Sequence, residues 1–353
     1  MIAASRSSAP ACRSGLTAVS LYDAGTLPCA IDLSDNTNLW GPPPAATESL
    51  LRFTSGSIAR YPSAYSHDLK NSLARYASAD PSRIVTGCGS DDVLDSAIRA
   101  FGNPGDRLAF MDPSFGMIPV FAQVNGLVPV PIALDDLKDS SLDRILRQEA
   151  SILYLCSPNN PTGGIMSGAR IEEIVSTFRG LVIIDEAYVE FTSESHASLV
   201  SRYPNVMVTR TMSKAFGLAS LRIGYGIASE RIVREVEKSR GPFKVSAVAE
   251  AVAMDALEHG LPWMRERVAD MKSNRTRFVD RLCGMGFTPL PSEANFVLLP
   301  VVDAIPVGAL LREKGIAVRV FDDLPQIGGA LRITIGPWKY MDACLTAFDE
   351  LAA

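Results

Sequence analysis

The sequence of 353 residues has no apolar run that approaches the ~20 residues needed by a membrane-spanning helix. It also lacks a dominant charge, because 34 Lys and Arg stand against 39 Asp and Glu, and it has no internal repeat. A balanced charge gives no reason to expect nucleic acid or an anionic membrane as a partner. The hydrophobic fraction of 47% and the charged fraction of 21% are those of an ordinary globular protein. The sequence therefore predicts a soluble protein.

Cysteine and histidine are also sparse, with six cysteines, three histidines and no C-x-x-C pair. Such scattered residues do not fit a zinc framework, so we expect no metal site. Single cysteines in a long chain are typical of buried thiols in a reducing compartment, which favours the cytoplasm. The first 22 residues contain two arginines, no acidic residue and much Ser and Ala. This composition fits a transit peptide, but we favour a flexible N-terminal arm.

Short apolar runs alternate with segments of helical periodicity over most of the chain, a pattern typical of a mainly parallel α/β sheet covered by helices. Seven strands are expected, at 83–86, 108–111, 128–132, 152–156, 181–185, 206–210 and 223–228. After about residue 245 the pattern changes to a long polar helix and three shorter strands, expected at 263–283, 295–299, 317–320 and 331–335. We therefore predict an arm and connector at 1–40, a large domain at 41–245 and a smaller α+β domain at 246–353.

Small and polar residues follow the strand at 83–86, in the order Gly87-Cys88-Gly89-Ser90-Asp91-Asp92, before a helical segment. Ligands of open α/β sheets bind beyond the carboxyl ends of the strands. Glycines before a helix N-terminus leave amides free to bind an anion. Ser and Asp are also good helix caps. The segment therefore indicates either a phosphate site at Ser90 and Asp91 or a plain cap.

Three later segments carry further candidate residues. The loop 157–163 holds two asparagines between prolines, which makes it a stiff polar loop. Asp185 ends a buried strand, where a carboxylate is costly unless it meets a cation or a donor, so we expect it to anchor a protonated group. Lys214 lies among small apolar residues, which favours a nucleophilic amine, although a solvated lysine fits the segment equally well. Thr211, Ser213 and Arg222 could hold a phosphate.

Two nucleotide-binding classes share parts of this pattern. Asp185-Glu186 after an apolar strand is similar to the Walker B strand of an ATPase, but the chain has no G-x-x-x-x-G-K-[ST] segment. Gly87-Cys88-Gly89 is similar to the start of a dinucleotide-binding fingerprint, but Asp92 occupies the third glycine position. A carboxylate there would face the pyrophosphate, which disfavours this class.

Taken together, these segments resemble the pyridoxal-phosphate (PLP) enzymes of fold type I, in the class I and II aminotransferase group. The most specific parts are 157–163, Asp185-Glu186-Ala187-Tyr188 and 213–218 with Arg222, which occur in the family's order and spacing. The resemblance runs from about Asn36 to Gly336, and within the group it is strongest to histidinol-phosphate aminotransferases. Two segments depart from the family. Its N-x-N-P-[FY]-G-P segment, usually with Glu at x, reads Asn36-Thr37-Asn38-Leu39-Trp40-Gly41-Pro42 here, and Ser63 replaces Asp after Tyr61-Pro62.

The resemblance implies a role for each candidate residue. Lys214 would bind PLP as a Schiff base and move a proton, while Asp185 would pair with the pyridinium nitrogen and keep it protonated. The other implied cofactor contacts are Asn160 and Tyr188 at the phenolic oxygen, Phe115 on the ring, and Ser90, Asp91, Thr211, Ser213 and Arg222 at the phosphate. Tyr61 would reach that phosphate from a second subunit, so the resemblance also implies a homodimer.

Substrate recognition is implied at four residues. Arg332 would hold the anionic end of the substrate with Asn160 nearby, Arg319 would help to bind a phosphate, and Tyr22 would match a tyrosine of the family's N-terminal arm. The implied reaction is a ping-pong transfer of an amino group from histidinol phosphate to 2-oxoglutarate or a similar oxo-acid. Aminotransferases for aromatic or other amino acids and threonine-phosphate decarboxylases use the same scaffold and remain alternatives. A non-catalytic PLP-binding protein is disfavoured because Lys214, Asp185 and Arg332 are all present.

Overall fold

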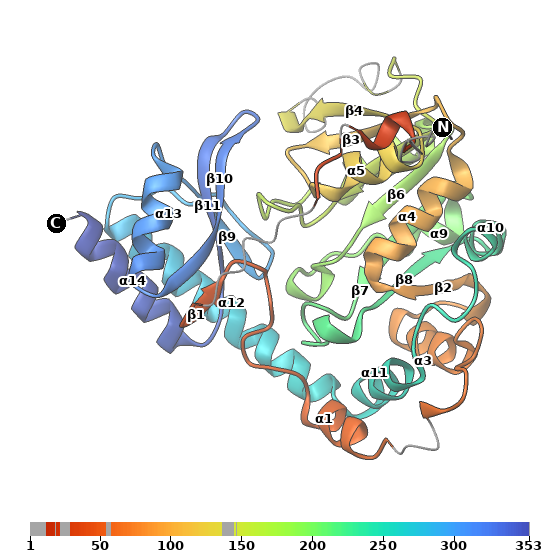
Figure 1. Ribbon diagram of the computed structural model, residues 1–353, viewed down its shortest axis with the longest axis horizontal. Coiled ribbons are helices and arrows are strands. Elements are labelled where there is room, and N and C mark those ends of the chain that lie inside the picture. Colours follow the sequence, from red (N-terminus) through yellow and green to blue (C-terminus); the bar gives the residue numbers. More distant parts are fainter. Residues whose placement is uncertain are drawn as a thin grey trace, which may run out of the picture.

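The computed structural model describes residues 12–17, 19–21, 29–53, 58–135, 145 and 147–352. The chain forms two lobes, and Figure 1 shows the larger one on the right and the smaller one on the left. Among the described residues, no helix combines the length and the apolar character that a membrane span requires. The predicted site residue Tyr22 lies outside the described residues.

The large lobe is built on a seven-stranded sheet of order β2-β8-β7-β6-β5-β3-β4. Its strands are β2 (Ile84–Cys88), β3 (Arg107–Asp112), β4 (Val128–Ala133), β5 (Ile152–Cys156), β6 (Leu181–Asp185), β7 (Val206–Thr211) and β8 (Ile223–Ala228). Only β8 runs antiparallel to its neighbours β2 and β7. This confirms the predicted mainly parallel seven-stranded sheet. β5 and β6 are buried along their whole length, which explains their continuous apolar sequences.

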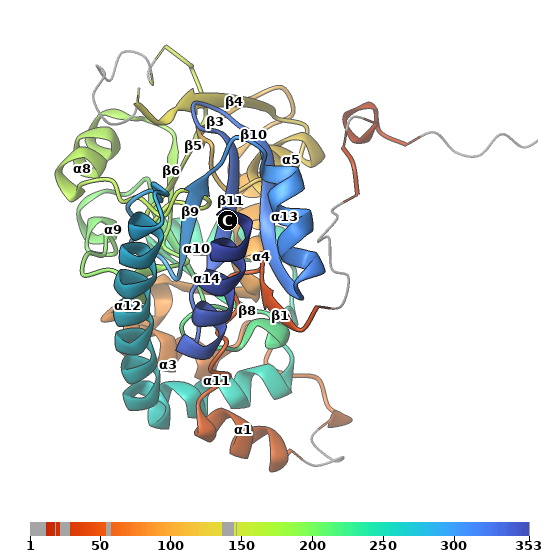
Figure 2. The same ribbon diagram turned by 90° about the vertical axis from the view of Figure 1, so that its left-hand side faces the viewer.

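Helices cover both faces of this sheet. They are α3 (His67–Ala77), α4 (Gly89–Phe101), α5 (Met117–Val124), α8 (Gly168–Thr177), α9 (Leu199–Arg202) and α10 (Glu230–Arg240). Figure 2 shows α8 and α9 on one side and α5 on the other. α4 begins directly after β2 and packs against β2, β7 and β8. The N-terminus of α4 therefore lies at the edge of the sheet where the parallel strands end.

The small lobe contains a four-stranded sheet of order β1-β10-β11-β9. Its elements are β1 (Ile31–Leu33), β9 (Phe296–Pro300), β10 (Ile316–Leu324), β11 (Gly328–Thr334), α13 (Ala304–Glu313) and α14 (Trp338–Ala352). The helix predicted at 263–283 is α12 (Leu261–Gly284). It runs from the small lobe to the end of the large lobe that contains α1 (Pro44–Leu51) and α11 (Ala247–His259) (Figure 1). The strands predicted at 295–299, 317–320 and 331–335 correspond to β9, β10 and β11 with shifted ends.

Two segments cross the predicted domain boundaries. β1 belongs to the predicted arm but pairs in parallel with β10 of the small sheet. α11 belongs to the predicted small domain but packs against α3 and against α1. The domain boundaries at residues 40 and 245 therefore stay a prediction. In the folded protein, β1 from the start of the sequence pairs with β10 from near its end.

The residues 34–43, here called the connector, run between the lobes beside the ends of β6 and β7. Asn36 N–H donates to Thr334 Oγ1 at 2.9 Å, and Asn38 Nδ2 donates to the Ala215 carbonyl at 2.9 Å. Gly217 has a φ of +66°, and a Cβ added to it would lie 2.4 Å from the Gly41 carbonyl oxygen. A glycine is therefore needed for the connector to approach the segment after β7.

Candidate active site

A cavity of about 500 Å³ lies where β5, β6 and β7 end and α4 begins. The structure brings most of the sequence-predicted site residues together in its lining, namely Ser90, Asp91, Phe115, Asn160, Asp185, Tyr188, Thr211, Ser213, Lys214, Arg222 and Arg332. Asp35, Asn36, Met117 and Cys156 also line it, and the sequence did not single them out. Of these four residues, Asn36 alone had a signal, since it is the first residue of the segment that matches the family's N-x-N-P-[FY]-G-P.

A second cavity of about 600 Å³ adjoins the first and shares Asp35, Phe115, Met117, Asn160 and Arg332 with it. The predicted residue Arg319 lines this second cavity, as do residues 19–21 of the N-terminal segment. Tyr61 lines neither of these two cavities. Its side chain is 86% exposed and contacts the ring of Phe243 with a centroid distance of 5.1 Å. The structure therefore separates Tyr61 from the other predicted residues.

Asp185 ends β6 and is buried at the base of the first cavity. Its Oδ2 accepts a hydrogen bond of 2.8 Å from the Tyr154 hydroxyl, and its Oδ1 accepts one of 3.1 Å from Ala187 N–H. Burial raises the pKa of the Asp185 carboxyl to about 6, and the Tyr154 hydrogen bond opposes this shift. The carboxylate is thus held in place at a position where a cation would lower its energy.

Lys214 follows β7, and its ammonium nitrogen donates to the Asp35 carbonyl at 3.1 Å. The same nitrogen lies 6.0 Å from the centroid of the Tyr188 ring. Burial lowers the pKa of Lys214 to about 8, and the positive charge of Arg332 acts in the same direction. A substantial fraction of this amine is therefore neutral just above neutral pH, as a nucleophile requires.

Hydroxyls, a guanidinium and a helix N-terminus meet at the other end of the cavity. Arg222 Nη1 lies 3.4 Å from Ser213 Oγ, and Arg222 Nη2 lies 3.2 Å from an Asp91 carboxylate oxygen. Thr211 Oγ1 donates to Ser213 Oγ at 2.9 Å. Gly89 has a φ of +79°, and a Cβ there would lie 2.3 Å from Arg222 Nη2, so only glycine admits the guanidinium. This end of the cavity has the groups that bind a phosphate.

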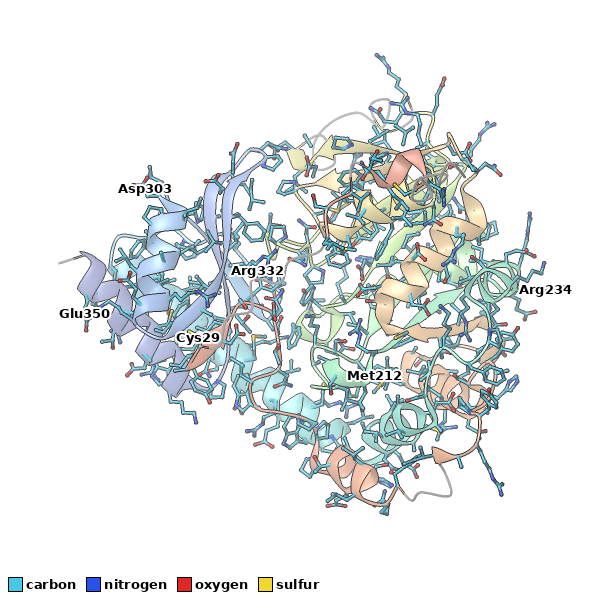
Figure 3. The ribbon with its side chains drawn as sticks, viewed as in Figure 1. Cys29, Met212, Arg234, Asp303, Arg332 and Glu350 are labelled. Carbon is cyan, nitrogen blue, oxygen red and sulfur yellow. The ribbon has the colours of Figure 1, made fainter. Side chains whose placement is uncertain are left out.

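The two candidate substrate arginines come from neighbouring strands of the small sheet. Arg319 and Arg332 are directly paired in the register of β10 and β11, so their side chains leave the same face of the sheet. Arg332 donates to Asn160 Oδ1 and to the Ser34 carbonyl, each at 2.6 Å. Figure 3 shows Arg332 on the side of the small lobe that faces the large one. The small lobe thus presents positive charge to the cavities.

The residues beside Asp185 and Thr211 in the chain point away from the site. Glu186 is buried and accepts a hydrogen bond of 2.9 Å from Arg210 Nε, and neither residue lines either of the two cavities. Glu186 is therefore a structural partner of Arg210 rather than part of a nucleotide site. No group of three or more His, Cys, Asp or Glu in the described part of the chain has the arrangement of a metal site.

The chain is similar to known proteins along almost its whole length. The family model of aminotransferase class I and II matches residues 29–348. A histidinol-phosphate aminotransferase of Thermoanaerobacter pseudethanolicus is 32% identical over 336 residues, which cover 94% of this chain and 95% of the relative. That of Microcystis aeruginosa is 34% identical over 321 residues, which cover 90% and 91%. The crystal structure of histidinol-phosphate aminotransferase from Sinorhizobium meliloti in complex with pyridoxal-5'-phosphate has the same fold, with a TM-score of 0.88, 24% identity and 98% of both chains covered.

Proposed function

We propose that this chain, which belongs to the class I and II aminotransferase family, is a PLP-dependent transaminase that takes the amino group of histidinol phosphate and passes it to 2-oxoglutarate or a similar oxo-acid. One observation carries the proposal: Lys214, Asp185 and the phosphate-binding end at Arg222 line a single cavity. PLP supplies an aldehyde that condenses with amines and a pyridinium ring that accepts electrons. All other steps fall to side chains of the chain itself.

The residues present fit each part of PLP. Ser213, Arg222 and the first amides of α4 suit its phosphate, because cations, hydroxyls and helix N-termini all bind dianions. Asp185 suits a protonated ring nitrogen, since it is a buried carboxylate with no cation among its hydrogen-bond partners within the described residues. Lys214 suits the aldehyde, because its pKa of about 8 leaves neutral amine available. The cavity thus offers one matching group for each reactive part of the cofactor.

The same side chains account for proton movement and orientation. We infer that the Lys214 amine takes a proton from the substrate Cα and delivers it to C4′ of the cofactor. Its lowered pKa suits it both to accept and to donate this proton. Asn160 accepts from Arg332 through its Oδ1, which leaves its NH₂ group as a donor toward the cavity. A substrate anion bound at Arg332 would therefore lie beside Asn160, the residue whose NH₂ group would hold the cofactor.

The arginine pair supports a phosphorylated substrate. Two guanidinium groups on one face of the sheet favour a dianionic phosphate over a monoanionic carboxylate. The second cavity, of about 600 Å³, has room beside Arg319 for a substrate that extends from Lys214. Histidinol phosphate has both the amine and the phosphate that this arrangement needs. An aminotransferase for aromatic amino acids would need Arg332 alone, as a carboxylate clamp.

A single half-reaction assay tests the substrate. We expect histidinol phosphate to exceed unphosphorylated histidinol in kcat/KM by roughly 100-fold or more, because each charge-assisted contact is worth about 1.5–3 kcal/mol. Arg319→Ala should lose part of this preference, and Arg319→Ala combined with Arg332→Ala should remove it. The measurement is the loss of the cofactor absorbance band with each donor, alone and in competition with phenylalanine. If phenylalanine reacts faster and Arg319→Ala changes nothing, the substrate assignment is wrong and only the transaminase assignment remains.

We also propose a homodimer in which Tyr61 reaches the phosphate site of the partner. Tyr61, Leu51 and Ile58 are 86%, 81% and 67% exposed, and Phe243, which contacts Tyr61, is 44% exposed. Apolar side chains gathered on α1 and the segment after it are typical of an interface rather than of a monomer surface. A second copy would cover them and bring Tyr61 to a cavity that it does not line in its own chain.

A mixed dimer tests the shared site. Tyr61→Ala should weaken PLP affinity by roughly 10-fold or more, since it removes a hydrogen bond to a charged group, and Tyr61→Phe should show how much of the loss comes from the hydroxyl. Lys214→Ala and Tyr61→Ala subunits, refolded together, should regain up to one intact site per mixed dimer. The measurement is activity against the mixing ratio, with sedimentation to count subunits. Activity no greater than the sum of the two parents would show that Tyr61 acts within its own chain.

We propose that the enzyme works in the cytoplasm. All six cysteines lie within the described residues and all are free thiols, with Cys156 and Cys344 buried. Free thiols in this number are typical of a reducing compartment.

A further inference from the structure

Asn36 is the residue at which the two lobes and the candidate active site meet. It is 1% exposed and adopts a left-handed backbone with a φ of 56°. Its N–H donates to Thr334 Oγ1 at 2.9 Å, and its carbonyl accepts from Asn295 Nδ2 at 3.0 Å, so the small lobe holds its backbone. Its side-chain Nδ2 donates to the Tyr188 hydroxyl of the large lobe at 2.9 Å. Asn36 thus transmits the position of the small lobe to Tyr188.

The hydrogen bonds at Thr334 fix which way the Asn36 amide faces. The Thr334 hydroxyl accepts from Asn36 N–H, and its own proton lies toward Asn36 Oδ1 at 3.4 Å. Oδ1 therefore faces Thr334, and the NH₂ group faces Tyr188. An amide NH₂ can only donate, so the Tyr188 oxygen must act as the acceptor in this pair. The proton of the Tyr188 hydroxyl must then point to another acceptor.

We propose that Asn36 is a positioning residue that makes the Tyr188 hydroxyl a donor into the cavity, aimed at the phenolic oxygen of PLP. The inference rests on the proposed function, because it needs the cofactor in the cavity that Tyr188 lines. A donor stabilises the negative charge on that oxygen and so favours release of the proton that the oxygen shares with the Lys214 nitrogen. Loss of the donor raises the pH at which this proton leaves.

The other titratable groups that face Tyr188 are unchanged in an Asn36 variant. They are Arg332 from β11, Asp185 from β6, Lys214 after β7 and the thiol of Cys156 from β5, which burial keeps neutral by raising its pKa. The Asn36 hydrogen bond and Arg332 both favour negative charge near the phenol, while burial opposes it. Asn36→Asp alters this hydrogen bond and adds one negative charge, so the part of the shift in proton release that exceeds the effect of the added charge can be assigned to the hydrogen bond.

The test is a pH titration of the visible absorbance band of the purified holoenzyme. Asn36→Asp is nearly isosteric, but its carboxylate accepts the Tyr188 proton and so removes the donor from the cavity. We expect it to raise the midpoint pH by about one unit or more, in the same direction as Tyr188→Phe. In the Tyr188→Phe background the Asn36→Asp shift should fall to less than half, because only the effect of the added charge remains.

Two variants complete the design. Asn38→Ala removes the side-chain hydrogen bonds of another connector residue, which donates to the Ala215 carbonyl and accepts from Trp40 N–H, and it should leave the midpoint unchanged. Thr334→Val removes the hydroxyl that orients the Asn36 amide and should raise the midpoint even if Asn36→Asp does not fold. Equal Asn36→Asp shifts in both backgrounds, or a shift with Asn38→Ala as large as that with Asn36→Asp, would overturn the role of Asn36. A wild-type protein with no band removable by borohydride would instead overturn the proposed function, and this inference with it.

Discussion

Lys214→Ala should reduce transamination by roughly four orders of magnitude or more, because one amine supplies both covalent attachment and proton transfer. The variant should still bind PLP through the phosphate-binding end at Arg222 and through Asp185. In the wild-type protein, borohydride should remove the visible band and leave the cofactor attached to Lys214. Peptide mass spectrometry locates the attachment, and single-turnover kinetics give the loss. Lys244→Ala is the matched control, since Lys244 is bound to Asp92 by an ion pair of 2.9 Å.

The pH dependence of cofactor attachment checks the same residue. Only the neutral amine attacks an aldehyde, and the pKa of Lys214 is lowered to about 8 by burial and by Arg332. The rate at which apoprotein gains the visible band should therefore rise with pH and level off above about 8. Attachment to another lysine, or turnover that survives Lys214→Ala, would show that Lys214 has a different role. An unchanged rate from pH 6 to 9 would show that the amine is not the attacking group.

The large sheet could be predicted because its signals are local. Each of its strands is a short apolar run between segments of helical period, and β5 and β6 are buried along their length. β1 could not be predicted in this way, since three residues carry no periodicity and its partner β10 lies near the other end of the chain. A boundary placed at residue 40 from sequence alone therefore leaves β1 outside the small sheet to which it belongs.

The candidate site was predictable where its residues follow strands, as Asp185 and Lys214 do. Residues that act through a distant partner were not. Asn36 and Thr334 are 298 positions apart and meet only because the connector passes between the lobes. Tyr154 lies inside a buried strand, where a tyrosine is read as core, yet its hydroxyl holds Asp185 at 2.8 Å. A sequence pattern shows what a residue could do but not which way its neighbours face.

Asp185→Asn should leave a folded protein that binds PLP less tightly and turns over far more slowly. A neutral amide cannot keep the ring nitrogen protonated, so the cofactor loses its capacity to accept electrons. The lost charge-assisted contact is worth about 1.5–3 kcal/mol, or roughly 10- to 100-fold in affinity, while kcat should fall by more than that. Tyr154→Phe is the matched control, since it keeps the carboxylate and its Ala187 donor and removes only the hydroxyl donor. Equilibrium dialysis and kcat are compared for both variants.

The stability of the apoprotein separates a catalytic role of Asp185 from a structural one. Burial raises the pKa of its carboxyl from the usual 3.8 to about 6, so the folded state binds the proton more tightly than the unfolded chain does. The contribution of Asp185 to the free energy of unfolding therefore falls as pH rises from about 4 to about 6, and at neutral pH the ionised group is unfavourable. Asp185→Asn removes this penalty, so the Tm of the apoprotein at neutral pH should equal or exceed that of the wild type.

PLP affinity of the wild type should fall below about pH 6, where the carboxyl takes up a proton, and that of Asp185→Asn should not change there. A variant with a much lower Tm and near-normal turnover would show that Asp185 serves the fold rather than the chemistry.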